Sequence, residues 1–113
     1  MTVDPRRPTP TTEPVRIAEA DARHAVLVFS GSLDAPALRV LEELLLDHRL
    51  REPTVWTLDM SHLDHIDLAC AYALLRTVTR VPEPVAVTVR GARGTVHRTL
   101  RHAGMDTVAS FEH

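Results

Sequence analysis

The pattern of apolar and polar residues along the chain predicts a sheet of five short strands. Runs rich in Val, Ile, Thr and aromatic residues, bounded by turn-forming residues, are typical of strands; they occur at 15–20, 24–30, 54–60, 85–89 and near 107–110. Only residues 21–23 separate the first two runs, so we expect a hairpin. Its first strand alternates apolar and polar residues with period two, so we expect it at an edge of the sheet. We expect the second strand in the interior of the sheet. The third run is typical of a strand covered on both faces.

Apolar residues that recur every three or four positions predict three amphipathic helices, at 35 to about 50, 67–80 and about 92–102. Residues 31–34 are expected to end the second strand. Asp34 and Asp67 stand where the N-caps of the first two helices are expected, and Gly104 stands where a left-handed residue would stop the third. The faces expected to pack on the sheet carry Leu38, Leu41 and Leu45, then Ala71, Leu74, Leu75 and Val78, then Val96, Leu100 and Ala103.

The order of these elements predicts a single α/β domain. With 113 residues the chain is long enough for one core and too short for two. Strands that alternate with helices favour parallel crossovers, so we expect a mixed central sheet of four to five strands with three to four helices and an antiparallel first strand. Residues 1–14 contain four Pro and four Thr and are expected to form a disordered tail, which leaves 15–113 as the domain.

The stretch 58–75 is the strongest candidate for a functional site. It reads as the end of a buried strand, a polar turn that begins at Ser61-His62, and an apolar helix that starts after Asp67. The N–H groups at the start of a helix lack partners within the helix, and the positive end of the helix dipole lies there. Ligands and partners of open α/β sheets commonly dock at such corners.

Composition excludes several classes of function. The formal net charge of -2 gives no bulk attraction to nucleic acid or to an anionic membrane. No apolar run approaches the roughly 20 residues needed to span a bilayer, and residues 1–14 lack the apolar core of a signal peptide, so we expect a cytoplasmic protein. The motifs G-x-x-x-x-G-K-S/T, G-x-G-x-x-G and G-x-S-x-G are absent, so neither an enzyme nor a bound cofactor is expected.

Three local groups have both a functional and an ordinary interpretation. Cys70, the single cysteine, could be a redox-sensitive thiol near a helix N-terminus, although a small buried residue is the commoner case. A metal site is not expected at His62 and His65 with their neighbouring aspartates, because turn residues at this spacing need not converge. The third group is a basic stripe at the last helix, which we interpret as a solvated face: Arg90, Arg93, His97, Arg98 and Arg101.

Three stretches together resemble one family, the STAS domains. They are GSLD at 31–34, LDMSHLDHID at 58–67 and LRHAGMD at 100–106. The family's usual versions read roughly G-E-L-D, L-D-L-S-x-V-x-F-I-D-S-S-G and V-L-x-x-x-G-L-D. STAS domains form the anti-sigma factor antagonists and the cytoplasmic tails of sulphate transporters. In the antagonists, the resemblance implies binding to an anti-sigma kinase, with release when a serine at a helix N-terminus is phosphorylated.

The departures from the family pattern fall on one corner. Residues 68–70 are Leu-Ala-Cys where the family has Ser-Ser-Gly or similar, so Ala69 occupies the phospho-acceptor position and has no oxygen to modify. Ser32 replaces the glutamate of G-E-L-D. Whether Ser32 or Ser61 accepts phosphate instead is left open. The residues expected to bind a partner are Ser32, Asp34, Asp67, Leu68, Ala69, Cys70, Tyr72, Ala73 and Arg76.

The resemblance therefore implies an anti-sigma factor antagonist that binds its partner without the usual phosphorylation switch. The expected partner is an anti-sigma factor with a kinase-like fold or another STAS protein. One alternative is a module of a transport or sensory complex that binds a lipid, a nucleotide or an anion. Another is a degenerate subunit that holds a heteromeric assembly together. The oligomeric state stays open.

Overall fold

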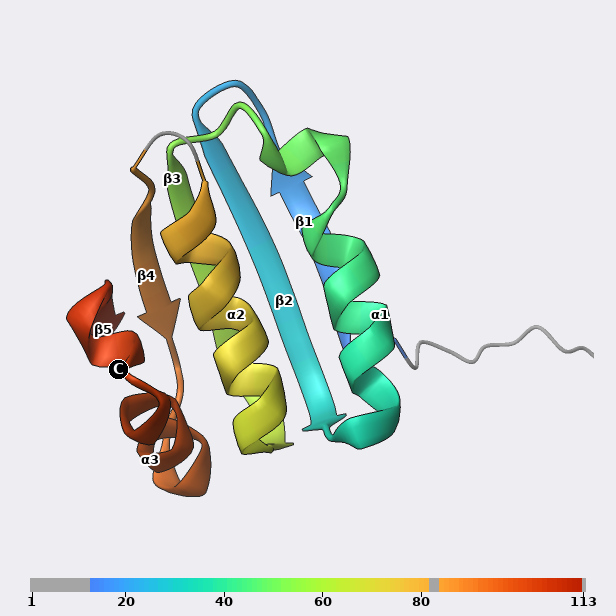
Figure 1. Cartoon of the computed structure of the whole chain (residues 1–113), viewed down its shortest axis with the longest axis vertical. Coiled ribbons are helices and arrows are strands. Elements are labelled where there is room, and N and C mark those ends of the chain that lie inside the picture. The colour runs from blue at the N-terminus through green and yellow to red at the C-terminus, as the bar shows by residue number, and fades with distance from the viewer. Residues whose placement is uncertain (1–12, 82–83, 113) are drawn as a thin grey trace, which may run out of the picture.

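One five-stranded sheet forms the centre of the molecule (Figure 1). The computed structural model describes residues 13–81 and 84–112. The strands lie in chain order across the sheet, and β1 is antiparallel to β2 while the other neighbours are parallel. Their bounds are β1 Val15–Ala20, β2 His24–Leu33, β3 Val55–Ile66, β4 Ala86–Arg90 and β5 Ala109–Glu112. The predicted hairpin, its edge strand and the mixed sheet are confirmed.

Three α-helices connect the parallel strands: α1 Ala35–Leu45, α2 Leu68–Arg80 and α3 Gly94–Ala103. Two short 3-10 helices follow α1 and α3, η1 His48–Leu50 and η2 Met105–Thr107. Each connection leads to the next strand in the same direction, and right-handed crossovers of this kind place the helices on one face of the sheet. Figure 1 shows α1 and α2 side by side over β2 and β3. The predicted α/β class and helix number are confirmed.

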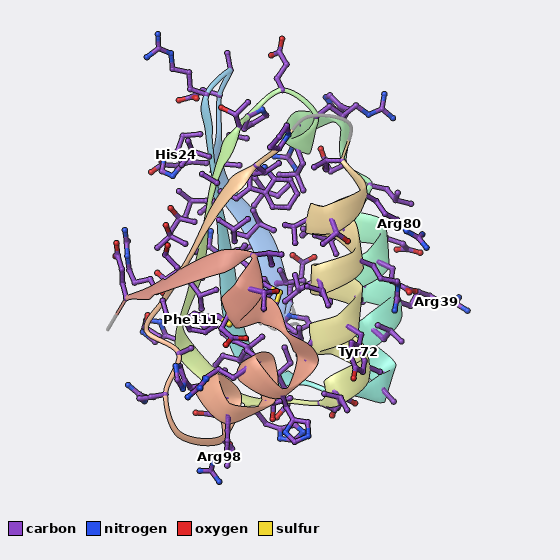
Figure 2. The ribbon with its side chains drawn as sticks, turned by 60° about the vertical axis from the view of Figure 1, so that its left-hand side comes forward. His24, Arg39, Tyr72, Arg80, Arg98 and Phe111 are labelled. Carbon is purple, nitrogen blue, oxygen red and sulfur yellow. The ribbon has the colours of Figure 1, made fainter. Side chains whose placement is uncertain are left out.

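The core lies between the helices and the covered face of the sheet. Ala25, Leu27 and Phe29 of β2 are fully buried there, and the predicted inward faces of the helices pack against them. On the other face of the sheet, His24 Nε2 lies 2.9 Å from Thr57 Oγ1, and Figure 2 shows His24 on the side away from the helices. The prediction that the third strand is covered on both faces is wrong, because the helices share one face and Val55 is 41% exposed.

The two central strands are longer than predicted. β2 continues to Leu33 instead of ending before residue 31, and β3 continues to Ile66 through the residues expected to form a turn. Their extensions pair with each other, from Ser30 opposite His62 to Leu33 opposite Ile66. Two irregularities shift the register there, so β3 carries an extra residue at each. The buried residues Leu63 and Ile66 are consequently three positions apart, which disguised the strand.

Several element ends also differ from the predictions. α1 stops at Leu45 instead of about residue 50, because Asp47 starts a separate turn by accepting a hydrogen bond from the Arg49 backbone N–H at 2.9 Å. α3 begins at Gly94 and ends at Ala103, and the predicted stop residue Gly104 follows it with a left-handed φ of 102°. The last strand is displaced by two residues towards the C-terminus. The predicted tail falls largely on residues 1–12, which lie outside the described residues. No described helix is long and apolar enough to cross a bilayer.

Two glycines give a matched test of the packing between the end of β4 and β3. Gly91 and Gly31 have similar left-handed φ values of 78° and 73°. A Cβ at Gly91 would lie 2.7 Å from Ser61 Cβ and 2.8 Å from Ser61 Cα, whereas nothing lies within 4 Å of one at Gly31. We expect Gly31→Ala to lower the free energy of unfolding by about 1–2 kcal/mol. Gly91→Ala is expected to lower it by about 1–3 kcal/mol more, because the β3 backbone must shift.

Urea-induced unfolding of the two variants measures this difference. Equal losses of stability would show that the β3 backbone shifts at Ser61 without cost. That result would contradict the close contact between β3 and the segment after β4.

Candidate functional site

The carboxyl ends of β2 and β3 meet at one edge of the sheet, where α1 and α2 both begin. The Asp67 backbone N–H donates to the Leu33 carbonyl at 2.9 Å and ties the two strand ends together. We call this region the corner and define it as residues 32–34 and 67–72. The predicted strand-to-helix switch is therefore present, although a paired strand replaces the expected polar turn.

The two aspartates of the corner behave differently. Asp67 is the N-cap of α2 as predicted: its Oδ1 accepts from the Cys70 backbone N–H at 3.1 Å. Asp34 occupies the N-cap position of α1, and its carbonyl accepts from the Ala37 N–H at 2.9 Å, but its carboxylate makes no capping hydrogen bond. Within residues 13–81 and 84–112, the half-buried Asp34 carboxylate makes no hydrogen bond or ion pair, so these residues leave it available to a partner.

An exposed stripe runs from the corner along α2. Leu68 and Tyr72 are 39% and 40% exposed, and Ala69 and Arg76 are also exposed. Arg76 Nη2 lies 3.9 Å from Glu42 Oε2 of α1, so the stripe continues towards that helix. Figure 2 shows Tyr72 on the helical side of the molecule. A leucine and a tyrosine within two turns of a helix N-terminus form an apolar surface next to the Asp34 and Asp67 carboxylates.

Two residues predicted to bind a partner do not reach this surface. Cys70 and Ala73 are 0% and 3% exposed, because they lie on the side of α2 that packs into the core. Direct contact with a partner was therefore a wrong prediction for both. Cys70 Sγ instead donates to the Asp34 carbonyl at 3.5 Å and helps to hold the start of α1 against α2.

The redox interpretation of Cys70 fails for the same reason. Burial raises the pKa of the Cys70 thiol to about 12, and the nearby Asp67 carboxylate adds to this shift. The thiol is thus protonated at neutral pH despite its place near a helix N-terminus, since the loss of solvation outweighs the helix dipole.

Sequence reasoning missed the basic border of the corner. His65, Arg98 and His102 line, together with Leu68, a shallow depression of about 370 Å³ between the corner and α3. Figure 2 shows Arg98 at the lower end of the molecule. Arg98 was assigned to a basic stripe, but its closeness to Leu68 depends on the packing of α3 against α2. The stripe itself is divided, because Arg90 lies 3.9 Å from Glu112 and the His97 ring packs edge-on to Phe111.

The histidines and aspartates of β3 do not gather into one group. Asp59 Oδ1 accepts hydrogen bonds from Ser61 Oγ at 2.6 Å and from the Ser61 N–H at 3.1 Å, and the Ser61 hydroxyl lowers the Asp59 pKa. His62 and His65 both lie on exposed positions of β3. Within residues 13–81 and 84–112, no three His, Cys, Asp or Glu side chains are grouped as a metal site would need.

Solved structures share this fold. Over 88% of this chain and 86% of the other, the protein is similar to the structure described as "Structure of the Anti-Sigma Factor Antagonist SpoIIAA in its Unphosphorylated Form", with a TM-score of 0.62 and 12% identity. It is also similar to part of a much longer chain, described as "The overall structure of SLC26A9", with a TM-score of 0.56 and 16% identity over 74% of this chain and 16% of that one. At these identities the likeness establishes the fold.

Family membership follows from the sequence. Residues 17–110 match the family described as "Mlab, STAS domain", so the chain belongs to the STAS-domain family. No curated protein matches the chain by sequence. The resemblance in the three short motifs is thereby confirmed across nearly the whole described domain.

The reactivity of two neighbouring positions tests the geometry of α2. Cys70 in the folded protein is expected to react with a thiol reagent at least about 100-fold more slowly than in urea, because its thiol is buried and protonated. The A69C/C70A variant moves the thiol by one residue onto the exposed stripe and is expected to react in the folded state nearly as fast as in urea. Fast labelling of native Cys70 would contradict the described orientation of α2.

Proposed function

We propose that this protein works by binding another protein through the corner, as an anti-sigma factor antagonist whose binding does not depend on phosphorylation of α2. The partner is an anti-sigma factor with a kinase-like fold, and the protein acts in the cytoplasm on transcription through that partner. The proposal needs neither catalysis nor a cofactor. Membership of the STAS family and the likeness to an anti-sigma factor antagonist support it.

The observation that carries the proposal is the exposure of Leu68 and Tyr72 on either side of Ala69. Among the described residues only five large hydrophobic side chains are exposed, and these two lie within one turn of each other at the corner. Burying what remains exposed of each would contribute on the order of 1 kcal/mol. An aromatic anchor with a charged border is the usual anatomy of the centre of an interface.

The charges at the corner suggest how a partner is oriented. The Asp34 carboxylate, which caps no helix, favours a basic group on the partner, while the start of α2 directs N–H groups outward. In a switching antagonist, a phosphate of about −2 charge would enter this apolar surface and weaken binding, because the charge would lose its water in the interface. Ala69 has only a methyl group, so a kinase cannot add a phosphate at this position of the surface.

Two substitutions test the role of the corner. Tyr72→Ala removes the proposed anchor and is expected to weaken binding to the anti-sigma factor by about 10- to 100-fold. Ala69→Asp places a negative charge at the acceptor position and is expected to weaken binding similarly. An acidic residue in the first turn of a helix is compatible with the helix dipole, so this variant should fold normally.

Affinity purification from the native cell identifies the anti-sigma factor, and calorimetry with the purified partner measures the affinity. Val55→Ala is the matched control, because Val55 is 41% exposed, close to the 40% of Tyr72, but lies on the open face of the sheet. If the Y72A/A69D variant bound as tightly as the natural protein, the corner would not be the binding surface.

A further inference from the structure

Basic side chains lie along the outward side of α3. Residues 84–105 contain four of the 13 Arg and none of the 15 acidic residues, so this segment has a formal charge of +4 although the whole chain has −2. Arg98, Arg101 and His102 of α3 are exposed, and we call the region around these three side chains the α3 surface. A basic surface is thus part of an acidic protein.

The α3 surface is continuous with the corner. One depression, of about 370 Å³, reaches the corner at Leu68, and a second, of about 460 Å³, extends past Arg101 to Asp106 of η2. Arg98 and His102 line both depressions, so a partner that covers the corner can also cover the α3 surface. Figure 1 shows α1 and α3 on opposite sides of α2, which places the basic border of the corner opposite its acidic border at the start of α1.

The basic side chains of the two depressions form no ion pair with a carboxylate of residues 13–81 and 84–112. Two acidic residues, Asp67 and Asp106, also line the depressions, and neither makes such a pair with them. The described residues therefore leave the Arg98 and Arg101 charges available to acidic groups of another molecule. Exposed charges of one sign speed the association of a partner that carries the opposite sign.

The shape of the α3 surface favours a protein segment over a small anion or a nucleic acid. A small ligand is normally enclosed by a concave site on which a few polar groups converge, whereas these depressions are shallow and their Arg side chains are exposed. The surface also continues into the apolar side chain of Leu68, which suits a protein partner. The net charge of −2 disfavours a nucleic acid.

We infer that a partner bound at the corner extends an acidic segment over the α3 surface, where its carboxylates pair with Arg98 and Arg101. This inference rests on the proposed function and adds the chemistry of the partner's contact surface. The partner then presents a basic group to Asp34 on one side of Leu68 and acidic groups on the other. These two opposite charges fix its orientation, because a reversed partner would bring like charges together.

Charge reversal on α3 tests this inference with the anti-sigma factor obtained by affinity purification. Arg98→Glu/Arg101→Glu is expected to lower the association rate constant, measured by stopped-flow mixing, by about 10-fold at about 0.05 M salt. At about 0.5 M salt the loss is expected to be less than about twofold, because salt screens exposed charges. If this variant does not fold, Arg98→Gln/Arg101→Gln removes the two charges without reversing them and is expected to slow association by about 3-fold at the lower salt concentration.

Arg23→Glu/Arg51→Glu is the matched control. It changes the net charge equally, and both residues are exposed at the opposite end of the molecule, where β2 and β3 begin. This control is expected to keep the association rate constant within about twofold of that of the natural protein, because its charges lie more than a screening length from the α3 surface.

Tyr72→Ala separates this inference from the proposed function. If Tyr72→Ala weakens binding but the α3 variants associate as fast as the control, the partner binds the corner and the inference is overturned. If neither Tyr72→Ala nor the α3 variants change binding, the proposed function fails and the inference fails with it. The inference is also overturned if a short DNA oligonucleotide binds the natural protein as tightly as the anti-sigma factor does and Arg98→Glu/Arg101→Glu abolishes that binding, because the surface would then recognise phosphate.

Discussion

The corner depends on the pairing of β2 with β3, which continues to the carboxyl ends of both strands. The two strands stay in register to Leu33 and Ile66, and the hydrogen bond from the Asp67 N–H to the Leu33 carbonyl closes the pair. Because α1 and α2 begin directly after these strand ends, their first turns lie next to each other. A shorter β3 would separate Asp34 from Leu68 and Tyr72, and the apolar stripe would lose its acidic border.

The first turn of α2 divides its residues between the core and the surface. Cys70 and Ala73 face inward, and the Cys70 thiol contacts the Asp34 carbonyl, so the core itself positions α1 against α2. Ala69 and Tyr72 face outward from the same turns. The outward side is free to vary without loss of packing, which explains how alanine can replace a phosphorylatable residue while the fold is kept. The same division makes Cys70 unreactive and leaves Leu68 exposed.

The correct predictions rest on residues whose role can be recognised from their immediate neighbours in the sequence. Asp67 was recognisable as a cap because it precedes an apolar helix, and Gly104 because it follows one. The extension of β3 was missed because its irregular pairing with β2 breaks the period-two pattern at residues 61–66. Cys70 and Ala73 were wrongly predicted to contact a partner, because the spacing of residues along a helix does not show how wide its buried face is.

The basic border of the corner had no counterpart in the sequence pattern. The border joins His65 to Arg98 and His102, which come from separate segments of the chain. Contacts of this kind depend on how the helices pack, which spacing along one chain does not record.

The central claim is that the corner binds its partner unconditionally, since position 69 offers no hydroxyl. It is tested most directly by incubating the protein with its purified anti-sigma factor and ATP, then measuring the intact mass of the protein and its affinity for that partner. The account predicts an unchanged mass and an unchanged dissociation constant. Addition of one phosphate, for example at the exposed Ser32 of the corner, together with weakened binding, would contradict it.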